Sequence, residues 1–163
     1  MSSKDKRFTV AGIYSGNHQR YATDAYGPTP TDAVIDAILR CREDNKGFVT
    51  GFDVCAVFRG SHPCKDVTVS DSRERPDPKR CRAKKWHKYT VVTEYSVEHV
   101  KDLSPIEAEL GFHGKVAGVF LGHVKDYSAE VDWERVKAET NPKTRAKVAQ
   151  VSTASTGASH ASA

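Results

Sequence analysis

The chain has 163 residues, of which 38% are apolar and 28% are charged, and its formal net charge is +4. This length suits one domain of ordinary size, and the composition excludes a wholly disordered protein. No segment approaches the roughly 18 apolar residues of a membrane span, and no signal-peptide core follows the polar start MSSKDKR. We therefore expect a cytoplasmic protein without a membrane partner.

The first third of the chain predicts the order strand, strand, helix, strand. Extended patterns at 7–15 and 20–26 flank the turn sequence GNHQ, which indicates a hairpin. A helix is expected over 29–45, because Thr29 can cap it, a proline follows the cap, and apolar residues recur at helical spacing. Segment 47–60 has apolar residues at both parities, which is typical of a central strand covered on two faces.

The phrase GPTPTDAVIDAI opens this helix. Together with the order of the elements, it resembles small domains in which a meander sheet carries one helix across a face. The partial ribonuclease-H-like half of some antitoxins is one such domain. The resemblance covers about a third of the chain and implies a fold without bringing any active residues with it.

The second half of the chain predicts two further strands and two short helices. The strands are expected over 87–97 and 114–124, and the helices over 104–111 and 128–139. Ser104 is followed by a proline and by a glutamate three positions later, which is a helix-start signature.

The predicted fold class is therefore α+β. We expect one mainly antiparallel sheet of about five strands, with one long and two shorter helices, in a single domain over residues 1–141. A basic loop at 61–88 is inserted in this domain. Residues 142–163 are polar and poor in apolar side chains, so they predict a disordered tail.

The four cysteines are expected to be reduced thiols, because cytosolic proteins rarely keep disulfides. Cys41 falls on the apolar face of the long helix and Cys55 lies in the apolar third strand, so both are interpreted as small core residues. Neither position favours an activated nucleophile.

The remaining cysteines raise the alternative of a zinc site. His62, Cys64, Cys81 and His87 supply four ligands of the kind that tetrahedral zinc accepts. Their spacing, however, is not that of a common zinc module, in which paired ligands stand two to four residues apart. The simpler interpretation is a pair of surface thiols that flank a long loop, with no cofactor.

The loop holds the densest positive charge in the chain. Eight basic residues lie between positions 73 and 89 against two acids, whereas nine acids face four basic residues between 91 and 135. The candidate nucleic-acid contacts are Arg73, Arg75, Lys79, Arg80, Arg82, Lys84, Lys85, Trp86 and Lys88. The cations would neutralise phosphates, while Trp86 and Tyr89 would stack on unpaired bases. Alternatively, Trp86 and Tyr89 anchor the loop to the core, and the cations only keep it solvated.

Motifs of phosphate-cradling loops, nucleophile elbows and helical zinc sites do not occur in the sequence. One looser set of side chains remains, which would bind a cation or move protons only if the fold brought its members together. It consists of His99, Asp102, Glu107, Glu109, His113 and His123. Solvated helix charges and loop histidines explain the same residues.

The hypothesis that follows is a small non-enzymatic binding or regulatory module that contacts nucleic acid through the basic loop. The small size, the lack of catalytic motifs and the charged arm suggest an accessory factor of a phage or mobile element. The first alternative is a module that binds a host protein as an inhibitor or adaptor, through a sheet edge or the acidic half. The second alternative is a zinc-stabilised small domain.

Overall fold

The computed structural model describes residues 5–44, 51–65 and 85–141. Their elements in chain order are β1 (Lys6–Tyr14), β2 (Arg20–Gly27), α1 (Pro30–Asp44), β3 (Phe52–Arg59), β4 (His87–Thr93), β5 (Val97–Asp102), α2 (Pro105–Leu110), β6 (Val116–Leu121), the 3-10 turn η2 (Ser128–Glu130) and α3 (Trp133–Thr140). The strands form two antiparallel sheets, ordered β2-β1-β3 and β5-β4-β6. We call them sheet A and sheet B.

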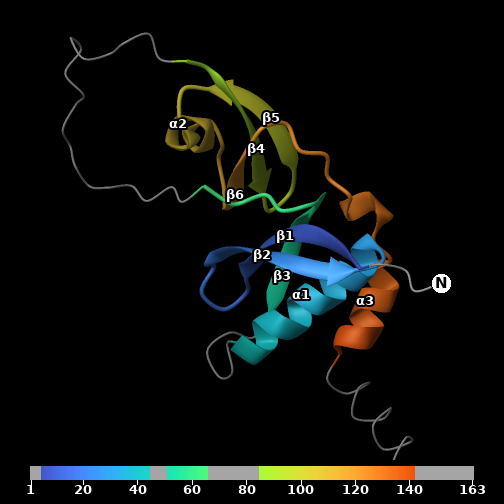
Figure 1. Ribbon diagram of the computed structural model, residues 1–163. Helices are drawn as coiled ribbons and strands as arrows, with labels where there is room; N and C mark the ends of the chain where they lie inside the picture. The colour runs from blue at the N-terminus through green and yellow to red at the C-terminus, as the bar shows by residue number, and fades with distance from the viewer. Residues whose placement is uncertain (1–4, 45–50, 66–84, 142–163) are drawn as a thin grey trace, which may run out of the picture.

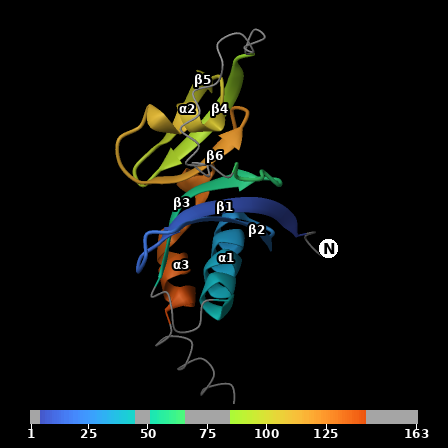
Figure 2. The same cartoon turned by 90° about the vertical axis from the view of Figure 1, so that its left-hand side faces the viewer.

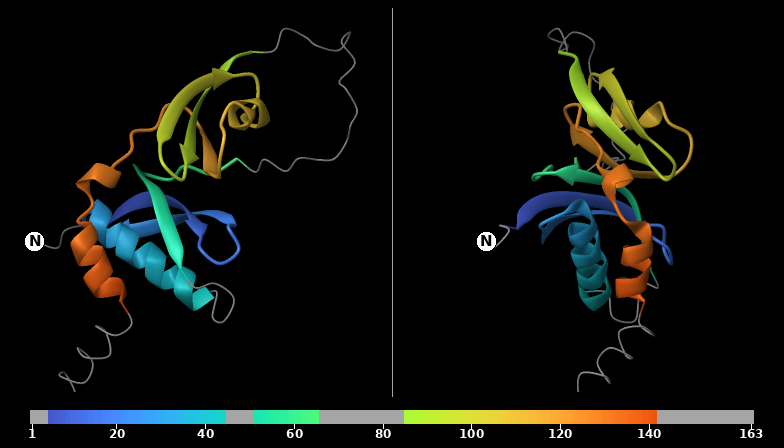
Figure 3. Two further views of the ribbon diagram at one scale, coloured as in Figure 1. Left: turned by 180° about the vertical axis from the view of Figure 1, so that it is seen from behind. Right: turned by 90° about the vertical axis from the view of Figure 1, so that its right-hand side faces the viewer.

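The elements are stacked in layers (Figures 1 and 2). Helices α1 and α3 cover one face of sheet A, and sheet B packs on its other face. Helix α2 lies on the far face of sheet B, where Ala108 meets Tyr89, Val91 and Val119. Views from behind and from the right-hand side show the same order of layers (Figure 3). Within the described ranges, no helix has the length and apolar character needed to cross a membrane.

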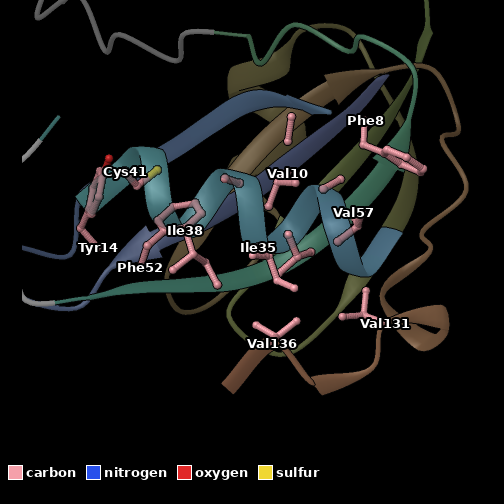
Figure 4. Close-up of a cluster of buried hydrophobic side chains, with 14 residues drawn as sticks. Phe8, Val10, Tyr14, Ile35, Ile38, Cys41, Phe52, Val57, Val131 and Val136 are labelled. Atoms are coloured by element: carbon pink, nitrogen blue, oxygen red, sulfur yellow. The ribbon is translucent and has the colours of Figure 1, made fainter. Parts of the chain in front are cut away.

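The main core lies between α1 and sheet A (Figure 4). Ile35 and Ile38 of α1 extend toward β3, and Val136 of α3 lies on the same side of the helix as Ile35 and closes the core there. Cys41 belongs to this core with an exposure of only 3%, which confirms its prediction as a packing residue. Burial raises the pKa of the Cys41 thiol and so keeps it protonated.

A second core joins the two sheets. Phe58 of β3 and Phe120 of β6 are fully buried, and their rings meet edge to face with centroids 5.0 Å apart. Ala11, Ala56 and Val92 fill the space around them. Strand β3 is therefore covered on both faces, as its apolar residues at both parities predicted.

Several local predictions are confirmed. The hairpin, the long helix and the strand after it are present, and Thr29 caps α1 by accepting a hydrogen bond from Asp32 N at 3.3 Å. Ser104 caps α2 in the same way, accepting from Glu107 N at 3.2 Å. Residues 45–50 and the tail at 142–163 lie outside the described residues.

The prediction of one sheet with about five strands is wrong in detail, because six strands form two sheets. Strand β5 was missed because its charged sequence VEHVKD lies at a sheet edge and is largely exposed. The prediction that segment 47–60 forms a central strand is also wrong: β3 lies at the edge of sheet A and β1 is central, because α1 returns the chain to the free edge of β1. The helix expected over 128–139 is divided, with a 3-10 turn first and α3 beginning only after the Asp132 cap.

The two sheets are two copies of one strand-strand-helix-strand unit. Both have the first strand in the centre and the third strand on the same side. Three short motifs recur in the same order: RFTV at 7–10 and KYTV at 88–91, TPTDA at 29–33 and SPIEA at 104–108, and VFRG at 57–60 and VFLG at 119–122. The register shifts between Ala11 and Gly12 in one copy, and between Val92 and Thr93 in the other, also correspond.

The contacts between the copies are reciprocal. Phe58 at the end of β3 forms a β-bridge with Asp126, which follows the second copy, and Phe120 at the end of β6 forms one with Cys64, which follows the first. Tyr127 N donates to Val57 O, and Lys65 N donates to Val119 O, both at 2.8 Å. Each copy thus covers the open strand edge of the other, as in an isologous two-fold interface.

Two buried threonines hold equivalent turns at the ends of β3 and β6. Thr9 Oγ1 donates to Gly60 O at 3.0 Å and accepts from His62 N at 2.8 Å. Thr90 Oγ1 donates to Gly122 O and accepts from Val124 N, both at 2.8 Å. Both glycines have positive φ, +94° and +91°, which a side chain would strain.

This symmetry predicts that Thr9→Val and Thr90→Val destabilise the protein by similar amounts. Each substitution keeps the shape of the side chain but leaves one partly buried carbonyl and one N–H without this partner, which costs about 1–3 kcal/mol. Urea unfolding measures the loss. Thr23→Val is the matched control, because the Thr23 hydroxyl makes only a 3.4 Å contact with a neighbouring carbonyl. Equal stability of all three variants would contradict the role given to the two turns.

Candidate nucleic-acid interface

The structure describes only some of the residues that were predicted to contact nucleic acid. Lys85, Trp86 and Lys88 are described, and they lie just before or at the start of β4. The others lie outside the described residues: Arg73, Arg75, Lys79, Arg80, Arg82 and Lys84. The structure therefore shows the last residues of the basic loop, where it joins β4, and these residues are called the base of the basic segment.

Trp86 is an exposed side chain. Its residue exposure is 63%, whereas that of Tyr89, three positions later, is 4%. Tyr89 packs with Val91 and Ala108 between sheet B and α2, so it anchors the strand and is not available for stacking on a base. The expectation that both aromatic residues would stack is wrong for Tyr89, because it occupies the position that Phe8 fills in the first copy.

Lys88 lies directly opposite Lys101 in the β4–β5 ladder. Both residues are exposed, and neither forms an ion pair with a carboxylate of the described residues. Like charges placed opposite each other across two strands repel and destabilise the pair. An anion bound between them would remove this repulsion, so the pair marks a position where an anion is favoured. Because β5 was not predicted, sequence reasoning missed Lys101.

The described members of the proposed zinc set lie on different parts of the fold. His62 Nε2 is 2.9 Å from Arg59 O in the turn after β3, Cys64 packs into the inter-sheet core, and His87 begins β4. In the described ranges, no group of three or more histidine, cysteine or acidic residues could hold a metal ion. Cys81 lies outside these ranges, so the four-ligand set stays a prediction.

The looser set of histidines and acids comes together only in part. The rings of His99 and His123 stack with centroids 4.7 Å apart and an interplanar angle of 11°. The carboxylates, in contrast, have structural partners: Glu109 pairs with Arg20 at 2.9 Å, and Glu107 takes part in the cap of α2. The histidine pair is the one contact of this set that joins two distant segments.

The sheets also leave a polar cleft between them. Two adjoining hollows of about 400 and 490 Å³ share Val54, Cys55 and Glu94. Cys55 is the sole thiol lining them in the described chain. Burial raises its pKa to about 11, and the nearby carboxylates of Asp53 and Glu94 act in the same direction. A thiol held so firmly in its protonated form is a poor nucleophile, so this cleft offers no support for cysteine chemistry.

Comparisons with protein-family models, with curated proteins and with solved structures find no match to this chain.

Because of its raised pKa, Cys55 should be alkylated slowly in the folded protein. At pH 8, iodoacetamide should label it about a hundredfold more slowly than an ordinary thiol, because the thiolate fraction is smaller by that factor. Mass spectrometry of the peptide that contains Cys55 measures the rate, and the same peptide labelled in concentrated urea is the control. Rapid labelling of Cys55 without denaturant would show that the thiol is activated and would reopen a catalytic role.

Proposed function

We propose that this protein is a non-enzymatic nucleic-acid-binding module that engages unpaired nucleotides through its basic segment and the base of that segment at β4. The base consists of Lys85, Trp86, Lys88 and the cross-strand partner Lys101. The cations meet phosphates, and the indole of Trp86 stacks on a base.

The observation that carries the proposal is the exposure of Trp86 beside unpaired cations. An exposed indole costs free energy in water, and residues of its size are more often buried or placed at an interface. Had Trp86 packed into sheet B and the lysines paired with carboxylates, the segment would be explained as a solvated loop. In the described chain the indole is exposed, and Lys88 faces a lysine instead of an acid.

The combination of an exposed indole with neighbouring cations favours binding of single strands over a duplex. Bases in a duplex are stacked on one another and present no free face to an aromatic side chain, whereas those of a single strand do. Stacking and phosphate contacts are largely independent of sequence, so we expect affinity for DNA and RNA with little base preference. The cytoplasmic location and the phage or mobile-element origin stay predictions.

A binding experiment with substituted proteins tests the proposal. Fluorescence anisotropy with a short labelled single strand, at about 50 mM salt, gives the affinity. Trp86→Ala should weaken binding about tenfold, because stacking of one base contributes about 1–3 kcal/mol. Lys88→Gln and Lys101→Gln should each weaken it severalfold, to the same extent for strands of different sequence.

Lys137→Gln is the matched control. Lys137 is an exposed lysine of α3, and it is paired with Glu134 at 2.8 Å, far in the sequence from the proposed site. Its loss changes the net charge by the same amount but should leave the affinity unchanged. Undetectable binding of any strand at low salt would overturn the proposal. A protein partner that is recovered from the host and survives nuclease would then favour the protein-interaction alternative.

A further inference from the structure

A concave surface of about 430 Å³ lies beside the base of the basic segment. It is formed where the turn after β3 meets the turn after β6. Arg59 and His62 line it from the first turn, and His123 and Lys125 line it from the segment that follows β6. We call this surface the turn pocket.

The turn pocket is lined by two permanent cations and two protonatable rings, and none of its lining residues is acidic. Arg59 is exposed and forms no ion pair with any carboxylate of the described residues. Lys125 lies over the ring of Tyr127 at 4.5 Å and is 3.7 Å from Glu130, a pair in which both side chains are largely exposed. Such an exposed pair is weak, so Lys125 is available to another anion.

The carboxylate nearest in sequence is turned away from the pocket. Asp126 Oδ1 accepts hydrogen bonds from Val57 N and Ser128 N, both at 3.0 Å. Asp126 therefore completes the edge of sheet A and, among the described residues, forms no ion pair with the cations of the pocket. A pocket that concentrates positive charge in this way favours an anionic ligand.

The walls of the turn pocket are held in place before any ligand binds. Thr9 fixes the turn that carries His62, and Thr90 fixes the turn that carries His123, through the hydrogen bonds described above. His99 stacks on His123 and also approaches Val124 O with Nε2 at 3.0 Å. Side chains on rigid turns lose little conformational freedom on binding, which favours affinity.

The pocket also adjoins the proposed nucleic-acid site. Gly122, which lines it, donates its N–H to Lys88 O at 2.7 Å. From the other wall, the chain continues through His62 to Lys65, which is held beside β6. The described residues on both sides of the basic loop therefore hydrogen-bond to β6 or to the turn that follows it.

We propose that the turn pocket binds a phosphate group, with the Arg59 guanidinium as its main ligand and Lys125, His62 and His123 around it. Guanidinium and phosphate match in geometry and form paired, charge-assisted hydrogen bonds. This inference rests on the proposed function only for the source of the phosphate, which is either a terminal monoester or a backbone diester of the bound strand. The pocket itself is argued from its own charges and geometry.

The first experiment uses inorganic phosphate and the whole protein. In a nuclear magnetic resonance titration at constant ionic strength, phosphate should shift the amide signals of Gly60, His62, Gly122 and His123 in a saturable manner, and chloride should not. Arg59→Gln should weaken this binding at least about fivefold, and Arg59→Lys should restore part of it. Lys125→Gln should independently weaken phosphate binding, and the control Lys137→Gln should keep full affinity for phosphate. Shifts no larger than those caused by chloride, or shifts unchanged in Arg59→Gln, would overturn the inference.

The second experiment compares oligonucleotides with a 5′-phosphate and with a 5′-hydroxyl. A terminal monoester in the pocket predicts about fivefold tighter binding of the phosphorylated strand, and this preference should vanish in Arg59→Gln. A backbone diester predicts equal affinities that both fall in Arg59→Gln. Strand binding that is indifferent to Arg59 would overturn the pocket while leaving the proposed function intact. Local phosphate binding without strand binding would support the pocket and overturn the proposed function.

Discussion

The contact between Phe58 and Phe120 joins the two copies of the strand-strand-helix-strand unit at the core between the sheets. The two rings occupy equivalent positions in the two copies of the unit, and each is fully buried only because the other copy covers it. The reciprocal bridges to Asp126 and Cys64 cover the strand edges on either side. Removing one copy would therefore expose an apolar sheet face and an unpaired edge together, which small domains tolerate poorly.

The same contact positions the cationic surface. Because β3 and β6 end side by side at the inter-sheet core, the turns that follow them meet, and the pocket between Arg59 and Lys125 results. The hydrogen bond from Gly122 N to Lys88 O then places the start of β4 next to this pocket. The backbone of β4 at Lys88 is thus linked directly to the turn that carries the pocket, whose position follows from the packing of two phenylalanines. A buried apolar contact thus fixes the geometry in which the exposed charges of the proposed binding surface lie.

Local structure could be predicted from the sequence, and the relation between its parts could not. Capping residues such as Thr29 and Ser104 contact residues within one helical turn, so a few consecutive residues are enough to predict the cap. Strand β5 was not predicted, because an exposed edge strand does not need alternating apolar residues. The division of the strands into two sheets was not predicted, because apolar residues at both parities of β3 do not identify the element that covers each face. One signal was available: the recurrence of FTV as YTV and of VFRG as VFLG shows the internal repeat, and aligning the copies would have predicted both β5 and Lys101.

The salt dependence of strand binding is the most direct test of the proposed function, because it would count the phosphates that the proposed cations neutralise. The logarithm of the association constant should fall linearly with the logarithm of the salt concentration. For four or more phosphate contacts the slope should be about −3 or steeper, which corresponds to a loss of roughly fiftyfold or more between about 50 and 200 mM salt. An affinity that does not change over this range would contradict the account, because binding would then not depend on the cations of β4, β5 and the turn pocket.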